Sequence, residues 1–196
     1  MSFDGATFCE GAWFRRLVFS GHASFEDTTF SGGTSFDVAT FSNGGSFDRA
    51  TFCDLSWFDR ATFMGNLSFY TTMFAFDASF SRATFAGVTS FRQATFSGDT
   101  SFENATFSRG TYFNRARFAR NTSFRGATFS DPISFCETRF SGSSSFRETT
   151  FSKMASFSRA SFSLAVSFEE ATFSARRWFN DVKFLGSVYP SGLALE

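Results

Sequence analysis

The sequence predicts an all-β solenoid, in which short strands wind into stacked coils around a phenylalanine core. Phenylalanine recurs at alternating intervals of five and six residues from Phe3 to Phe184, and 34 of the 35 phenylalanines lie on this repeat. The residue two before each Phe is small or branched almost everywhere, and the residue directly before it is Ser or Thr in 25 of 34 units. Such a sustained period indicates a repeat architecture, because one unit cannot bury its apolar face alone.

Each unit alternates as an extended strand does. Residues two apart lie on the same side of an extended backbone. In the unit around Phe96, Ala94 and Phe96 therefore point inward and Thr95 points outward. A five-residue unit is too short for a strand and a full loop, so each unit forms one short side of a coil. The glycines of the chain are expected to mark corners, where a positive φ or a tight turn is needed.

Two coil sizes fit this repeat. A two-sided coil of 11 residues would have to hold two Phe rings and two small residues between flat faces about 10 Å apart. A four-sided coil of 22 residues stacks each ring on the ring about 4.8 Å above it. We favour the 22-residue coil because its core packs better. It predicts about eight coils and a rod on the order of 40 Å long. Residues 1–184 would form this single solenoid, and residues 185–196 a C-terminal tail or cap.

Over residues 2–184 the chain resembles the pentapeptide-repeat family, as the stretch from Ala94 to Gly98 illustrates. The family consensus has a small residue two before a central Leu or Phe and a polar residue directly before it. The resemblance implies a right-handed quadrilateral β-helix with four units per coil. The chain departs from the family pattern through an extra residue in every second interval, such as Gly44 or Asp99, and through Phe at every central position.

Composition argues against several classes of function. The formal net charge is zero, from 18 acidic and 18 basic residues, so nothing attracts the whole chain to nucleic acid or to an anionic membrane. No apolar run could span a bilayer, and the N-terminus does not resemble a signal peptide. The three cysteines are expected outward and unpaired, which indicates a reducing compartment. We therefore expect a cytoplasmic protein without membrane association.

Side chains that carry chemistry are scarce. His22 is the single histidine, so no histidine-based triad or paired-histidine metal site can be drawn without it. Its corner position predicts a solvated side chain. No glycine-rich phosphate loop occurs, and carboxylate pairs such as Glu169 and Glu170 are expected at the surface. The sequence predicts a protein that is not an enzyme and needs no metal or cofactor.

Function in a solenoid is expected where outward positions depart from Ser and Thr. The largest departure lies within one coil, where four apolar or aromatic side chains replace polar ones: Met64, Tyr70, Met73 and Phe76. Exposed apolar clusters often mark partner surfaces, so these four residues form the predicted interaction patch. The alternative is a bulged corner whose side chains fold back on the coil.

Aromatic and charged side chains also fall into rows when the sequence is read every 22 residues. Trp13 and Trp57 share one outward row two coils apart, while Tyr112 and Trp178 are expected on the opposite face. Residues 104–130 contain five arginines and no acid. An acidic row near the N-terminus comprises Asp4, Glu26 and Asp48. These charged rows could orient a partner, and a scattered solvated surface is the alternative.

The ends of the solenoid predict self-association. Terminal coils expose unpaired strand edges and half-covered rings, and the repeat begins at Phe3 without a preceding cap. The resemblance implies the same, because family members often dimerise through their C-terminal coils. We expect an end-to-end homodimer whose contact residues are Trp178, Tyr189, Leu193 and Leu195. The alternative is that the chain is one segment of a longer protein whose missing part caps the first coil.

Three functions are compatible with these features. The leading one is a non-enzymatic rod that binds another protein. A second follows from the resemblance, since some family members mimic duplex DNA and protect type II topoisomerases. Those members are strongly acidic, as a mimic of a phosphate lattice must be, whereas this chain has zero net charge. A third is ice binding through the outward threonine row from Thr40 to Thr172, although Met64 and Ala86 interrupt the companion row. Hydroxyls also simply suit exposed β positions.

Overall fold

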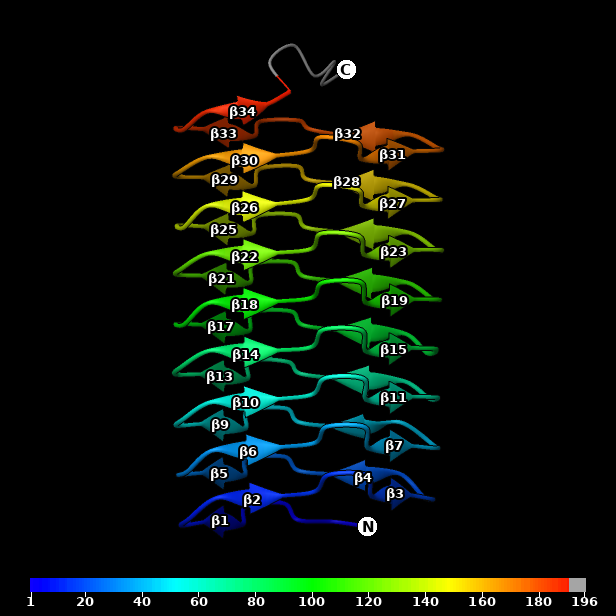
Figure 1. Ribbon diagram of the computed structural model, residues 1–196, viewed down its shortest axis with the longest axis vertical. Coiled ribbons are helices and arrows are strands. Elements are labelled where there is room, and N and C mark those ends of the chain that lie inside the picture. The colour runs from blue at the N-terminus through cyan, green and yellow to red at the C-terminus, as the bar shows by residue number, and fades with distance from the viewer. Residues whose placement is uncertain (191–196) are drawn as a thin grey trace.

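The computed structural model describes residues 1–190 and shows four parallel β-sheets that run along a rod (Figure 1). Its 34 strands are each two residues long, and each pairs with the strand four places further along the chain. Paired residues are 22 positions apart, as Thr7 and Thr29 are. The four-sided, 22-residue coil is therefore confirmed, with eight complete coils and two further strands. No helix that could cross a membrane lies within residues 1–190.

Sheets 1 and 2 contain nine strands each. Sheet 1 consists of β1 (Thr7–Phe8), β5 (Thr29–Phe30), β9 (Thr51–Phe52), β13 (Met73–Phe74), β17 (Thr95–Phe96), β21 (Arg117–Phe118), β25 (Arg139–Phe140), β29 (Ser161–Phe162) and β33 (Lys183–Phe184). Sheet 2 consists of β2 (Ala12–Trp13), β6 (Thr34–Ser35), β10 (Ser56–Trp57), β14 (Ala78–Ser79), β18 (Thr100–Ser101), β22 (Thr122–Ser123), β26 (Ser144–Ser145), β30 (Val166–Ser167) and β34 (Val188–Tyr189).

Sheets 3 and 4 contain eight strands each. Sheet 3 consists of β3 (Val18–Phe19), β7 (Thr40–Phe41), β11 (Thr62–Phe63), β15 (Thr84–Phe85), β19 (Thr106–Phe107), β23 (Thr128–Phe129), β27 (Thr150–Phe151) and β31 (Thr172–Phe173). Sheet 4 consists of β4 (Ala23–Ser24), β8 (Gly45–Ser46), β12 (Leu67–Ser68), β16 (Thr89–Ser90), β20 (Thr111–Tyr112), β24 (Ile133–Ser134), β28 (Ala155–Ser156) and β32 (Arg177–Trp178).

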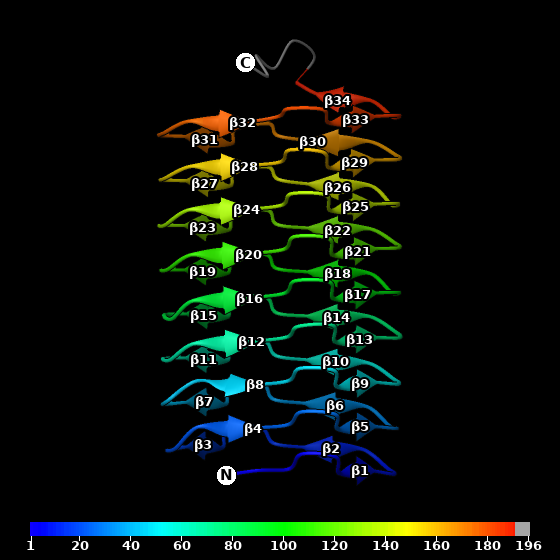
Figure 2. The ribbon, with the colours of Figure 1, turned by 180° about the vertical axis from the view of Figure 1, so that it is seen from behind.

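The four sheets follow one another around the coil. Sheets 1 and 2 meet along one long edge of the rod and sheets 3 and 4 along the other, in both views (Figures 1 and 2). Sheet 1 is therefore opposite sheet 3, and sheet 2 is opposite sheet 4. Positions that are neighbours on one face are 22 residues apart in the sequence, whereas sequence neighbours lie around the coil.

Four columns of stacked phenylalanine rings form the core. Phe74 and Phe96, which are consecutive in one column, have ring centroids 4.8 Å apart and planes within 2° of parallel. The columns beside sheets 2 and 4 meet edge to face across the middle of the rod, as Phe80 and Phe91 do at 5.5 Å. Each buried Phe contributes about 1.5–3 kcal/mol from removal of its surface from water. The repeat predicted from the sequence is thus the packing unit of the core.

Positive φ angles at the corners are not confined to glycine. Every eleventh residue from 5 to 181 has a positive φ, and 15 of these 17 positions carry a side chain, as Arg82 does with φ of 57°. Arg82 is the third residue of a turn that the Ala83 N–H closes on the Phe80 carbonyl at 3.1 Å. A left-handed third residue is typical of type II turns. Only Gly5 and Gly126 are glycine in this series, because the stacked coils impose the turn on whichever residue falls there.

The solenoid also continues beyond the boundary predicted at residue 184. Val188 and Tyr189 form β34, which pairs with β30, and Val188 packs against the core. Pro190 stands where the next Phe of the repeat would fall. Because Pro replaces Phe there, the Phe repeat did not predict the last unit. The C-terminal boundary of the solenoid is corrected to at least Tyr189.

Candidate functional surfaces

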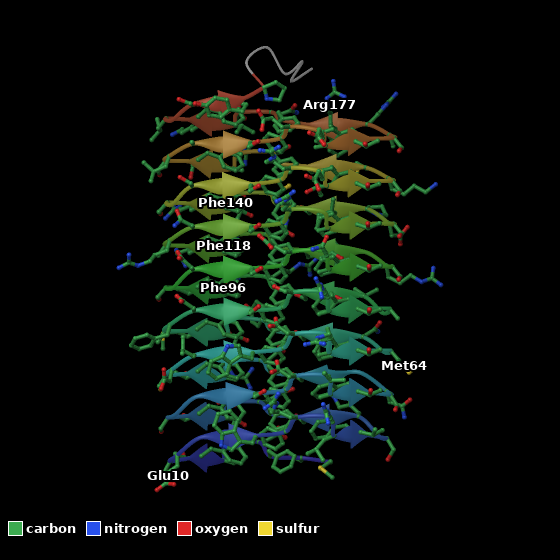
Figure 3. All side chains as sticks on the ribbon, in the orientation of Figure 1. Glu10, Met64, Phe96, Phe118, Phe140 and Arg177 are labelled. Carbon is green, nitrogen blue, oxygen red and sulfur yellow. The ribbon has the colours of Figure 1, made fainter. Side chains whose placement is uncertain are left out.

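The four residues of the predicted interaction patch are exposed, but they are distributed around one coil. Met64 follows β11 of sheet 3, Tyr70 lies at the corner between sheets 4 and 1, and Met73 belongs to β13 of sheet 1. Phe76 follows β13 toward sheet 2. Met64 thus projects from the opposite side of the rod (Figure 3). The side chains do not fold back as a bulge, and the structure does not gather the four on one face.

Two of the four residues predicted at the dimer contact lie in the last strands of the rod. Trp178 ends β32 of sheet 4 and Tyr189 ends β34 of sheet 2, and both side chains are exposed. Leu193 and Leu195 lie outside the described residues. The end-to-end homodimer stays a prediction, and the described part of its contact surface consists of aromatic side chains on two opposite sheets.

The predicted aromatic rows are formed. Trp13, Ser35 and Trp57 are in register on sheet 2, and the two indole rings stack with centroids 6.4 Å apart. The rings cover the serine between them, which is only 1% exposed. Tyr112 and Trp178 belong to sheet 4, which confirms that they face the other way.

Beyond Trp57, the outward row of sheet 2 contains only small hydroxyl side chains until it reaches Tyr189. Five serines continue the row in register: Ser79, Ser101, Ser123, Ser145 and Ser167. They line a groove of about 570 Å³ that Trp57 and Tyr189 also border. Six strand spacings separate these two aromatic residues, so the groove is about 29 Å long. We call this feature the sheet 2 groove.

Carboxylate and amide side chains border the sheet 2 groove along one side. Asp77 Oδ1 accepts a hydrogen bond from the Asp99 N–H at 2.8 Å, and Asp99 Oδ1 accepts one from the Asn121 N–H at 3.0 Å. On the other side, Glu103 accepts a hydrogen bond of 2.8 Å from the Ser123 hydroxyl. Each of these contacts joins one coil to the next. The borders of the groove are therefore held in place before any ligand binds.

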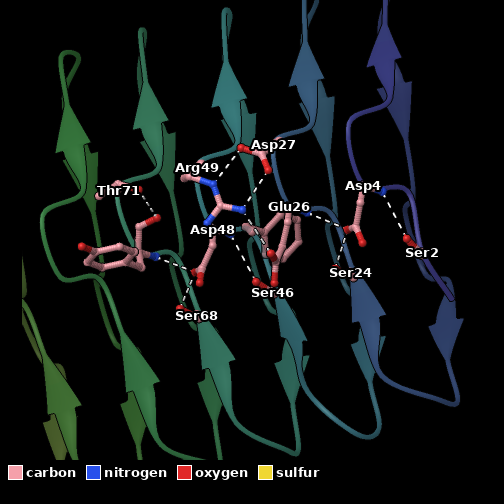
Figure 4. A network of polar contacts seen from close by, with 12 residues as sticks. Ser2, Asp4, Ser24, Glu26, Asp27, Ser46, Asp48, Arg49, Ser68 and Thr71 are labelled. Carbon is pink, nitrogen blue, oxygen red and sulfur yellow. Dashed lines mark hydrogen bonds and ion pairs between the residues drawn. The ribbon is translucent and has the colours of Figure 1, made fainter.

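The predicted acidic row near the N-terminus is engaged within the protein (Figure 4). Asp4 Oδ1 accepts hydrogen bonds from a serine hydroxyl and from the Glu26 N–H, and Asp48, two coils further along the same row, makes the same two kinds of contact. Arg49 donates two hydrogen bonds of 2.8 Å to Asp27, which lowers the pKa of that carboxyl group. The serine hydroxyl likewise lowers the pKa of Asp4. These carboxylates hold neighbouring coils together and do not form a bare anionic row.

The predicted threonine row is also formed. Seven threonines from Thr40 to Thr172 are paired in register along sheet 3. Met64 and Ala86 lie in the companion row, one position after the Phe of their strands. The structure therefore has one regular threonine row beside an interrupted companion row, and the ice-binding hypothesis stays a prediction.

The single histidine lies at the surface, and the described residues contain no metal-binding cluster. The His22 side chain is exposed, as its corner position predicts, and its Nδ1 lies 3.4 Å from the Asn43 carbonyl oxygen. Within residues 1–190, no group of three or more His, Cys, Asp or Glu is placed to hold a metal ion.

The chain matches one family model and, distantly, several solved structures. A family model described as pentapeptide repeats (9 copies) matches residues 25–73, 69–117, 91–135, 104–150 and 135–183. No curated protein sequence matches the chain. A trypsin-treated variant of QnrB1, a plasmid-mediated fluoroquinolone resistance protein, has 15% identity over 90% of this chain and 92% of that chain, with a TM-score of 0.18. A TM-score this low supports no inference from that protein.

Proposed function

The chain belongs to the pentapeptide-repeat family, and we propose that it is a non-catalytic rod whose sheet 2 groove binds an extended segment of a partner protein. The groove itself is the observation that carries this proposal. Its volume of about 570 Å³ falls in the range of about 300–1,000 Å³ that ligand sites occupy. Trp57 and Tyr189 at its ends are of the residue types that are enriched at protein interfaces.

The dimensions of the groove define the segment that would fit. An extended chain rises about 3.3 Å per residue, so about nine residues would span the distance from Trp57 to Tyr189. Apolar or aromatic side chains near the ends of the segment would contact these two rings. Polar groups between them would contact the serine hydroxyls. Because coil-to-coil hydrogen bonds already hold the borders, binding would cost little ordering of the rod.

The proposal predicts that a bulky side chain in the groove abolishes binding. Peptides with nine variable residues, displayed on phage, would be selected on the immobilised protein. The Kd of each selected peptide would then be measured by fluorescence anisotropy. We expect Ser145→Trp to weaken binding at least tenfold, because the indole would occupy the groove. We expect Ser90→Trp on the opposite sheet to change the Kd less than twofold.

Ser90 is a matched control for Ser145. Each serine is half-buried in the hydroxyl position of its strand, and each accepts a hydrogen bond from the backbone N–H two residues further on at 3.5 Å. The two variants should therefore melt at similar temperatures. An equal increase in Kd for both variants would contradict the proposal. It would also be contradicted if Ser145→Trp left the Kd of every selected peptide unchanged.

DNA mimicry is the second function that the family resemblance suggests. The net charge of zero and the internal engagement of Asp4 and Asp27 argue against it, because a DNA mimic must present a dense anionic lattice. We predict that the protein at micromolar concentration does not inhibit DNA supercoiling by a type II topoisomerase, as followed by gel electrophoresis. Inhibition that weakens as salt is added would instead favour DNA mimicry.

A further inference from the structure

A second groove lies where sheet 1 meets the corner from sheet 4, in the C-terminal third of the rod. Its volume is about 570 Å³. The sheet 1 side consists of four in-register residues: Arg117, Arg139, Ser161 and Lys183. The corner side consists of four residues that recur with the same spacing: Arg115, Glu137, Arg159 and Asp181. We call this feature the basic groove. Figure 3 labels Phe118 and Phe140, the core residues that follow two of its arginines.

Both carboxylates of the basic groove are already engaged by arginines of the corner. Arg115 Nε donates a hydrogen bond of 2.9 Å to Glu137, and this contact lowers the pKa of the Glu137 carboxyl group. Arg159 Nε lies 3.8 Å from an oxygen of Asp181. The corner side of the groove is therefore close to neutral, and the excess positive charge belongs to sheet 1.

The three cations on sheet 1 face solvent. Arg117, Arg139 and Lys183 are exposed, and within residues 1–190 none of them forms an ion pair or a side-chain hydrogen bond. Arg117 and Arg139 lie directly opposite each other on β21 and β25, where like charges destabilise a sheet. They also replace the Ser or Thr that this row carries at most other positions. An anion held between the two guanidinium groups would remove their repulsion.

We propose that the basic groove binds an acidic peptide segment of a partner protein. Guanidinium groups bind carboxylates through paired hydrogen bonds. Three strand spacings separate Arg117 from Lys183, a distance of about 14 Å that about four extended residues span. Alternate residues of an extended peptide point to the same side. Two or three acidic residues with neutral residues between them would therefore all face the cations.

The geometry favours a peptide over a nucleic acid. Each strand of a nucleic-acid duplex carries a phosphate about every 3.4 Å along the helix axis, so a strand that follows the cations would also bring phosphates against the carboxylates of Glu137 and Asp181. A peptide with alternating acids can instead place neutral side chains there. The cationic row is also only three strand spacings long, which offers few phosphate contacts. This site lies on a different sheet from the sheet 2 groove, so its test is independent of the proposed function.

The test measures binding of a fluorescein-labelled octapeptide of alternating Glu and Ala by fluorescence anisotropy. We expect the peptide to bind and to dissociate as salt is added, and an octapeptide of alternating Gln and Ala not to bind. The double variant Arg117→Gln/Arg139→Gln should weaken binding at least tenfold. A control double variant, Arg82→Gln/Arg109→Gln, removes the same charge outside the groove and should change the Kd less than twofold.

Several outcomes would overturn the proposal. Absence of binding by the Glu–Ala peptide would do so, and so would equal binding by the Gln–Ala peptide. Equal weakening in the two double variants would mean that only the overall charge matters. A single-stranded 12-nucleotide DNA that binds more tightly than the Glu–Ala peptide, and that depends on Arg117 and Arg139, would assign the groove to nucleic acid. Lys183→Glu should also weaken peptide binding. Because all these residues are exposed, no variant should melt below the parent, and loss of the repulsion between Arg117 and Arg139 should leave the melting temperature equal or slightly higher.

Discussion

Replacing Phe96 with alanine should lower the free energy of unfolding by about 3–5 kcal/mol. The Phe96 ring is fully buried and stacks between Phe74 and Phe118 with centroids 4.8 Å away on each side. Removal of the ring would leave a cavity in the middle of a column whose neighbours are held by their own stacking. Urea unfolding followed by circular dichroism would measure the change.

The residue before Phe96 supplies the control for this prediction. Thr95 is half-exposed in β17, and its hydroxyl points away from the core. Thr95→Ala should change the free energy of unfolding by less than about 0.5 kcal/mol. Equal costs for Thr95→Ala and Phe96→Ala would mean that the assignment of inward and outward positions is wrong.

Gly87→Ala should destabilise the protein by about 1–3 kcal/mol through overpacking. A Cβ atom on Gly87 would lie 2.3 Å from the carbonyl carbon of Gly65 and 2.4 Å from its oxygen. Both atoms belong to the backbone of the preceding coil, which cannot move aside as a side chain can. In a chain of this size, each 1 kcal/mol should lower the Tm by roughly 2–4 °C, so a thermal melt would detect the change.

Gly21 is the matched control for Gly87. Each glycine lies two residues after a Phe of sheet 3, but a Cβ on Gly21 would meet no atom within 4 Å. Gly21→Ala should therefore be neutral or stabilise the protein by up to about 1 kcal/mol, because alanine restricts the unfolded chain. A decrease in Tm of the same size for both variants would show that contact between coils is not the cause.

The core was predictable from the sequence because it depends on a single residue type at a strict spacing. The alternating intervals place Phe74, Phe96 and Phe118 one above another in a coil of 22 residues, and core packing favoured that coil over one of 11 residues. The turn at Arg82 was not predictable in the same way. The stacked coils impose its positive φ, and many different residue types occupy the equivalent positions. Pro190 hid the last unit because it replaces Phe in the repeat.

Which exposed side chains lie together on one face was predictable only from residues spaced 22 apart in the sequence. The predicted patch combined Met64 with Phe76, which are close in sequence but lie on different sides of one coil. Trp13 and Trp57 are far apart in sequence and stack on one face. The same spacing of 22 residues would have shown the serines that end at Tyr189, because neighbours on a solenoid face belong to successive coils.

Substitutions in the proposed binding surfaces should leave the packing of the core unchanged. Substitutions at exposed positions usually change stability by less than about 0.5 kcal/mol, so the outward rows can vary while the phenylalanine columns stay constant. The sheet 2 groove and the basic groove both consist of such outward residues. Two binding surfaces of different chemistry can therefore occupy different sheets of one rigid rod.

Site-specific photocrosslinking tests the central claim, that sheet 2 carries the partner-binding surface, most directly. A benzophenone amino acid would be placed at Ser101 or Ser145 on sheet 2, or at Ser90 or Ser134 on sheet 4, and the protein irradiated in extract from the cells that produce it. The account predicts one cross-linked partner protein from both sheet 2 positions and none from the sheet 4 positions. Cross-links of equal yield from both sheets, or from sheet 4 alone, would contradict it.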